Sequence, residues 1–74
     1  MNNPTKTLIS CIKEIGPIFL KGKLLENAKT HRTYQIKRYY PANVPKNVRF
    51  HIVYLDDLSK DFIMVRDHEE DTLI

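Results

Sequence analysis

The side chains with the greatest chemical potential in this sequence are basic and aromatic, and they gather between residues 34 and 54. This stretch mixes lysines and arginines with tyrosines, crosses two prolines and contains one histidine. Cationic groups contact phosphates and aromatic rings stack on bases, so the combination is typical of a surface that binds RNA or DNA. It is equally typical of the solvated face of an antiparallel sheet. Which interpretation applies depends on the helices and strands that position these residues.

Three histidines are the candidates for metal binding. His31, His51 and His68 lie about twenty residues apart, without the close spacing of a zinc-binding helix. His68 would hold a divalent ion only weakly together with Glu69 and Asp71, and an acidic tail without metal is the simpler interpretation. The sequence therefore predicts neither a metal site nor a cofactor.

His51 is the candidate for acid–base catalysis. It lies beside Arg49 and near Lys37, so it would serve as a general base in RNA cleavage, in a layout similar to that of small helix-plus-three-strand ribonuclease toxins. The glycine-rich flanks expected around such a histidine are missing. Cys11 lies on an apolar stripe, where a thiol is most simply a small buried side chain. We predict that the protein is not an enzyme, and a ribonuclease centred on His51 is the second alternative.

An amphipathic helix is the first element that the sequence predicts. Asn3 is a good N-cap, and Pro4 suits the first helical position. The apolar stripe at helical spacing consists of Leu8, Ile9, Cys11, Ile12 and Ile15. Gly16 followed by Pro17 predicts the end of the helix, because the residue before a proline is steered away from the helical region.

Strands follow a segment that is ambiguous. Residues 23–29 contain good helix formers and predict a second short helix, with a strand folded at Gly22 as the alternative. From residue 33 the apolar period changes to two. This period predicts three strands, over residues 33–40, 48–55 and 62–66. A polar turn joins the last two strands into a hairpin. The expected fold is α+β, with the N-terminal helix packed on a three-stranded antiparallel meander.

The length predicts one small domain over residues 1–74, in which residues 67–74 form an acidic tail that is frayed or a short terminal helix. A domain of this size buries only about 60% of its unfolded surface, so its stability is marginal. The one cysteine excludes an intramolecular disulfide. A partner protein or a homodimer would supplement such a core.

The net charge of +3 hides a strong division along the chain. Residues 21–49 contain eight basic side chains and one acid, whereas residues 56–71 contain seven acids and two basic side chains. Such a polarised chain steers charged partners by its surface potential. Alternatively, the acidic end lies against the basic middle and neutralises it within one molecule.

The candidate site lies on the sheet face opposite the helix. If the apolar residues around Ile36 and Ile52 pack on the helix, strand alternation places the basic side chains on the other face. The candidate nucleic-acid-binding residues are Gln35, Lys37, Tyr39, Arg49 and His51 on that face, with Arg38 joining them from the strand edge.

Two classes of binding function follow from these patterns. The first is a non-enzymatic module whose basic sheet face contacts RNA or DNA. The alternative is a small inhibitor, adaptor or subunit that docks on a larger host protein. Low glycine and alanine content beside many Lys, Ile and Asn residues suggests an AT-rich coding sequence, such as that of a phage or plasmid. No apolar run approaches the roughly 20 residues of a membrane helix, and no secretory signal is evident, so we expect a cytoplasmic protein without a membrane partner.

Overall fold

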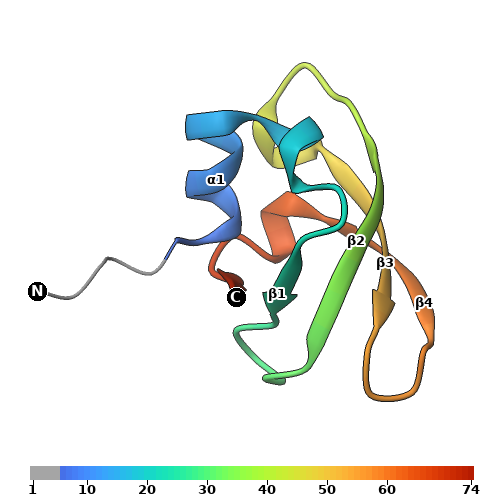
Figure 1. The fold of residues 1–74 in the computed structure, drawn as a ribbon. Coiled ribbons are helices and arrows are strands. Elements are labelled where there is room, and N and C mark those ends of the chain that lie inside the picture. Colours follow the sequence, from blue (N-terminus) through green and yellow to red (C-terminus); the bar gives the residue numbers. More distant parts are fainter. Residues whose placement is uncertain (1–5) are drawn as a thin grey trace, which may run out of the picture.

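The chain folds as a helix followed by strands that assemble into one sheet (Figure 1). The computed structural model describes residues 6–74. In chain order the elements are α1 (Leu8–Ile15), the 3₁₀ helix η1 (Pro17–Leu20), β1 (Leu24–Glu26), β2 (Thr33–Tyr40), the 3₁₀ helix η2 (Pro45–Asn47), β3 (Arg49–Tyr54), β4 (Lys60–Met64), the 3₁₀ helix η3 (Val65–Asp67) and β5 (Thr72–Leu73). Within residues 6–74, no helix combines the length and the apolar character that a membrane crossing requires.

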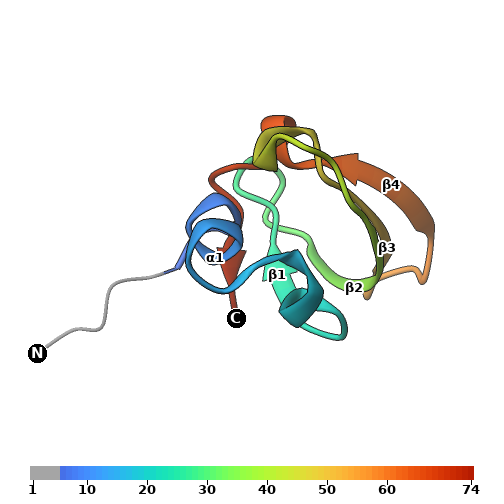
Figure 2. The same ribbon diagram turned by 90° about the horizontal axis from the view of Figure 1, so that it is seen from above.

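The sheet has five strands in the order β4-β3-β2-β1-β5, and all neighbouring strands are antiparallel. The predicted α+β class is confirmed, and so is the hairpin of β3 and β4. The expected three-stranded meander is wrong, because β1 and β5 extend the sheet by two short strands. In Figure 2 the sheet curves strongly, and α1 lies beside β1 and the C-terminal strand.

One hydrophobic core joins α1 to the sheet, as the sequence predicts. The helix contributes Leu8, Cys11 and Ile12. The sheet contributes the larger buried side chains, among them Leu25, Tyr34, Ile36, Phe50, Ile52 and Ile63. Burying a large apolar side chain stabilises a fold by roughly 1.5–3 kcal/mol, so this cluster holds the helix against the strands.

The ends of α1 follow from local hydrogen bonding. Thr7 is the N-cap: its hydroxyl accepts the N–H of Ser10, and the Ser10 hydroxyl accepts the N–H of Thr7. The expected cap residues Asn3 and Pro4 lie outside the described residues. The predicted end at Gly16 is confirmed, because its φ of 89° belongs to a region that glycine adopts at little steric cost.

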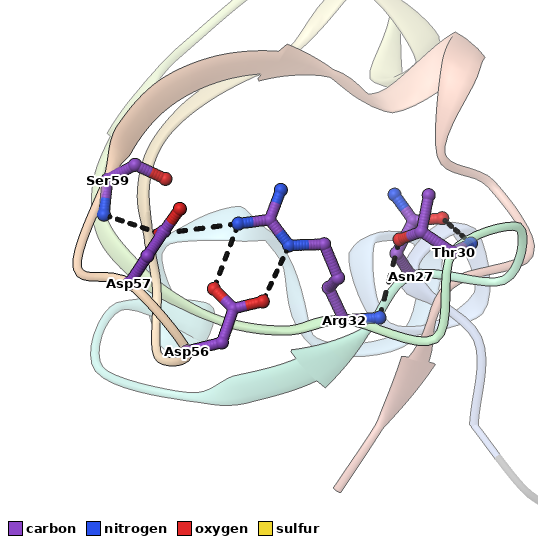
Figure 3. Close-up of polar contacts among 6 residues, drawn as sticks. All are labelled: Asn27, Thr30, Arg32, Asp56, Asp57 and Ser59. Carbon is purple, nitrogen blue, oxygen red and sulfur yellow. Dashed lines mark hydrogen bonds and ion pairs between the residues drawn. The ribbon is translucent and has the colours of Figure 1, made fainter.

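The expected helix over residues 23–29 is wrong. β1 pairs with β2, and Asn27 then begins a turn (Figure 3). Its Oδ1 accepts the backbone N–H groups of Lys29 at 2.8 Å and Thr30 at 3.1 Å. An asparagine that bonds the backbone in this way competes with helix formation. The alternative of a strand comes closer, since the chain turns at Gly22, with φ 86°, just before β1.

The acidic C-terminal segment is neither frayed nor helical beyond η3, which corrects the expectation for residues 67–74. β5 pairs with β1, and Asp71 is only 2% exposed. The carboxylate of Asp71 accepts hydrogen bonds from the Tyr34 hydroxyl at 2.7 Å and the Ala28 N–H at 2.9 Å, and it lies 2.9 Å from His68 Nδ1. Burial alone raises the pKa of Asp71, but these hydrogen bonds outweigh it and leave the pKa below its ordinary value.

β2 contains a bulge at Lys37. Ile36 pairs with Ile52, but Arg38 pairs with His51, so Lys37 has no partner of its own in the ladder. A bulge adds one residue to one strand. Every residue beyond the bulge therefore points to the opposite face of the sheet from the one that regular alternation predicts. The last three residues of β2 therefore face the opposite way from simple alternation.

Candidate nucleic-acid interface

The surface opposite the core is formed by β2, β3 and β4, and two rows of side chains cross it. In the strand order β2-β3-β4, the first row is Arg38, His51 and Phe62, and the second row is Tyr40, Arg49 and Met64. We call these six residues the outer face. On β3 they alternate with Phe50 and Ile52, which are fully buried in the core. The core thus fixes the direction in which the outer face points.

Three rings of the outer face contact one another. The rings of His51 and Phe62 are stacked, with centroids 5.0 Å apart and an angle of 24° between planes. The Tyr40 ring lies 6.1 Å from Phe62 at a tilted angle. Phe62 is 63% exposed, so much of its ring is open to solvent. An open aromatic ring on a sheet face is the geometry on which an unpaired base stacks.

The cations of this region keep their charge available. In the part of the chain that the structure describes, ion pairs engage Lys6, Arg32 and Lys46, but no ion pair engages Lys37, Arg38 or Arg49. A cation without a carboxylate partner contributes its full charge to the surface potential. Arg38 and Arg49 therefore lie beside the aromatic rings, with Lys37 next to Arg38 on the bulge, and no ion pair within the described residues neutralises them.

Arg32 shows the opposite behaviour, because the acidic end of the chain does neutralise it (Figure 3). Its Nε and one terminal nitrogen donate to the Asp56 carboxylate at 2.8 and 2.9 Å, and the same terminal nitrogen donates to Asp57 at 3.3 Å. The hydrogen bond from Arg32 lowers the pKa of Asp56 to about 2. The guanidinium also lies 3.8 Å above the Tyr54 ring. Arg32 thus links the start of β2 to the turn after β3, and its guanidinium is engaged in contacts within the fold.

Three of the six predicted site residues belong to the outer face: Arg38, Arg49 and His51. Gln35 lies opposite Val53 in the adjoining row, and its Nε2 donates to the Gly22 carbonyl at 3.1 Å. Lys37 is exposed as the extra residue of the bulge. The structure therefore brings five of the six predicted residues to this side of the sheet or its bulge.

The sixth, Tyr39, lies on the other side. Tyr39 pairs with Phe50 and packs against the core. Tyr40 lies on the outer face, where Tyr39 was expected. The physical reason is the bulge at Lys37, which reverses the alternation assumed for β2. Sequence reasoning also missed Phe62, because alternation alone did not decide whether Phe62 or its neighbour Ile63 faces the core.

The histidines lie apart from one another. His31 Nδ1 contacts Glu26 at 2.9 Å, and His68 contacts Asp71, whereas no hydrogen bond within residues 6–74 orients the ring of His51. A general base ordinarily has such an orienting partner. No group of three His, Cys, Asp or Glu side chains in the described range is arranged to hold a metal ion.

Cys11 is buried in the core, as predicted from its position on the helix stripe. Burial raises the pKa of its thiol. A buried thiol with a raised pKa has little thiolate and behaves as a small apolar side chain.

Comparison with protein-family models, with curated proteins and with solved structures gave no match to this chain. A function for the outer face is therefore inferred from its own residues alone.

Proposed function

We propose that the protein is a non-enzymatic binding module whose outer face contacts single-stranded nucleic acid. One observation carries the proposal: the exposed Phe62 ring lies in a row with His51 and Arg38 across three adjacent strands. Stacking by Phe62 supplies affinity that does not depend on the base, because every base has a flat face.

The arrangement favours a single strand over a duplex. In a duplex the bases are stacked on one another, and a ring on a shallow sheet face does not reach between them, whereas unpaired bases turn outward and stack on aromatic side chains. Arg38 and Arg49 lie in adjacent rows on neighbouring strands, each next to both His51 and Tyr40, where each would contact a phosphate. Lys37 adds a third cation from the bulge.

A salt titration tests this proposal. Fluorescence anisotropy of labelled single-stranded and double-stranded RNA and DNA, at two salt concentrations, measures the affinity and its salt dependence. We expect tighter binding of single strands, with log affinity falling by about 0.7 per phosphate contact for each unit of log salt. Affinity no better than millimolar at low salt contradicts the proposal.

Matched variants assign the contact to the outer face. Arg38→Ala should weaken binding and reduce the salt slope by about 0.7, the share of one phosphate contact on a single strand. Lys29→Ala is the control, because Lys29 is an exposed cation in the turn after β1 and makes no ion pair within residues 6–74. Equal effects of the two variants would indicate attraction by net charge alone.

Docking on a larger host protein, as an inhibitor, adaptor or subunit, is the second candidate. β4 favours it, because this strand forms one edge of the sheet and an edge strand can pair with a strand of another protein. Purification from the native host separates the candidates: one co-purifying polypeptide without nucleic acid supports docking, and nucleic acid without a stoichiometric polypeptide contradicts it. Ribonuclease activity centred on His51 stays an untested prediction.

A further inference from the structure

An apolar hollow lies where α1 meets η1, away from the outer face. It is lined by Ile15, Phe19 and Lys23. The side chain of Ile15 was expected on the buried helix stripe, but it is exposed, as are Ile18 and Phe19. Phe19 is 64% exposed; it lines the hollow together with Ile15, and Ile18 is its neighbour in η1. Such a patch is characteristic of an interaction site.

A second unusual feature is Leu58, in the turn between β3 and β4. Its side chain is 71% exposed, and its φ of 60° lies in the left-handed region, which glycine and asparagine adopt far more readily than leucine. The turn itself is well held, since the Leu58 N–H donates to the Tyr54 carbonyl at 2.9 Å and Asp57 accepts the Ser59 N–H at 2.9 Å. A large apolar side chain is thus presented at a position where local structure favours a smaller, polar one.

The charges around the two features are complementary. Lys23 lines the hollow and Lys21 lies next to η1, and neither forms an ion pair within residues 6–74. Around the Leu58 turn, Asp56, Asp57 and Asp61 outnumber Arg32 and Lys60. Arg32 engages the first two carboxylates, whereas Asp61 forms no ion pair within the described residues. In Figure 1 the turn after β3 and the junction of α1 with η1 lie at opposite ends of the molecule. One copy therefore cannot fill its own hollow.

We infer that Leu58 of one copy binds in the hollow between Ile15 and Phe19 of a second copy, with Asp61 facing its lysines. This contact is head to tail, so each copy uses one surface to donate and a different surface to accept. The inference concerns surfaces outside the outer face and does not rest on nucleic-acid binding.

Sedimentation equilibrium tests the contact, at protein concentrations from about 10 µM to about 1 mM because small interfaces bind weakly. We expect the average mass of the unaltered protein to rise about twofold or more over this range. Leu58→Asn and Phe19→Ser should each remain monomeric. Both are expected to fold, since the two side chains are exposed and asparagine suits the left-handed backbone at residue 58. Circular dichroism checks this.

A mixture of the two variants gives the sharpest result. Phe19→Ser keeps an intact Leu58 turn, and Leu58→Asn keeps an intact hollow, so the mixture should form a one-to-one complex that grows no further. A symmetric dimer that joined hollow to hollow or turn to turn would not show this complementation. The inference is overturned if the unaltered protein stays monomeric throughout, which would assign the hollow to a different partner, if either variant alone still associates, or if the mixture forms no complex.

Discussion

The rings of His51 and Phe62 stack across two adjacent strands, with centroids 5.0 Å apart, on the face of the sheet that points away from the core. Arg38 flanks His51 on the next strand. A row that combines an open aromatic ring, a histidine ring and a guanidinium that forms no ion pair within residues 6–74 presents stacking and phosphate binding within a short distance.

Phe62→Ala should weaken single-stranded nucleic-acid binding by roughly tenfold or more, because base stacking on an aromatic side chain contributes about 1–3 kcal/mol. The free energy of unfolding should fall by no more than about 1 kcal/mol, since the side chain is exposed and loses only its contacts with the rings of His51 and Tyr40. Phe19→Ala is the matched control: its ring is equally exposed but lies at the hollow beside α1. Equal loss of anisotropy signal in both variants would argue against stacking on the outer face.

Deletion of Lys37 should leave the protein folded. Without this residue, Ile36 and Arg38 become neighbours, and their pairing with Ile52 and His51 becomes a regular ladder in which every side chain keeps its face. Deletion of Gln35 is the control, because it forces an apolar residue of β2 onto the wrong side. Urea unfolding should show a cooperative transition for the first deletion and a much larger loss of stability for the second. Two equally damaging deletions would refute the assignment of the bulge.

Tyr34→Phe should destabilise the protein by about 1–3 kcal/mol, since the hydroxyl donates to the buried, charged Asp71 at 2.7 Å. Tyr54→Phe is a control on the neighbouring ring, which makes no side-chain hydrogen bond within residues 6–74. Thermal unfolding of both variants measures the difference. A tyrosine hydroxyl that contributed nothing would leave the two transitions coincident.

Stability should fall in acid through Asp71. The pKa of Asp71 is lower in the folded state than its ordinary value near 3.9, so the folded protein holds this proton less tightly than the unfolded chain. Its contribution to stability is therefore fully present above about pH 5 and is lost as the pH falls through the folded-state pKa. Unfolding free energies of the unaltered protein and Asp71→Asn, measured from pH 7 to pH 3, test this.

Asp71→Asn should be less stable than the unaltered protein at pH 7, but its free energy of unfolding should fall less steeply as the pH is lowered. Asp56→Asn is the control for acid sensitivity that arises at the surface, because Asp56 is an exposed carboxylate with a lowered pKa. If the stability of Asp71→Asn fell with decreasing pH as steeply as that of the unaltered protein, the role of the buried carboxylate would be contradicted.

The longer elements were predictable from the sequence because the apolar pattern repeats often enough in them to show its period. The stripe of Leu8, Cys11 and Ile12 gave α1, and the alternation around Ile36 and Phe50 gave β2 and β3. Local patterns of this length reflect burial of one face, which is the same in the sequence and in the fold.

The short strands were not predictable, because contacts distant in the sequence stabilise them. Leu25 of β1 pairs with Leu73 of β5, and the carboxylate of Asp71 binds the hydroxyl of Tyr34. In a stretch of two or three residues no period is detectable, and an acidic composition such as that around Asp71 ordinarily indicates a solvated tail.

The candidate site was predictable in its charges but not in its rings. Arg49 was expected on this face and lies there. Arg38 was expected to join it from the strand edge but lies on the face itself, whereas Tyr40 and Phe62 replace Tyr39 as the aromatic members. The bulge at Lys37 causes the exchange. No glycine marks it, and its register becomes evident only from the pairing of β2 with β3.

Backbone amide chemical shifts, followed by NMR while a single-stranded oligonucleotide is added at low salt, test the central proposal most directly. We predict that the largest shifts occur at Arg38, Tyr40, His51 and Phe62, and that the amides of residues 8–20 stay unmoved. Shifts that are absent at millimolar oligonucleotide, or that are confined to lysines outside β2, β3 and β4, would contradict nucleic-acid binding by the outer face.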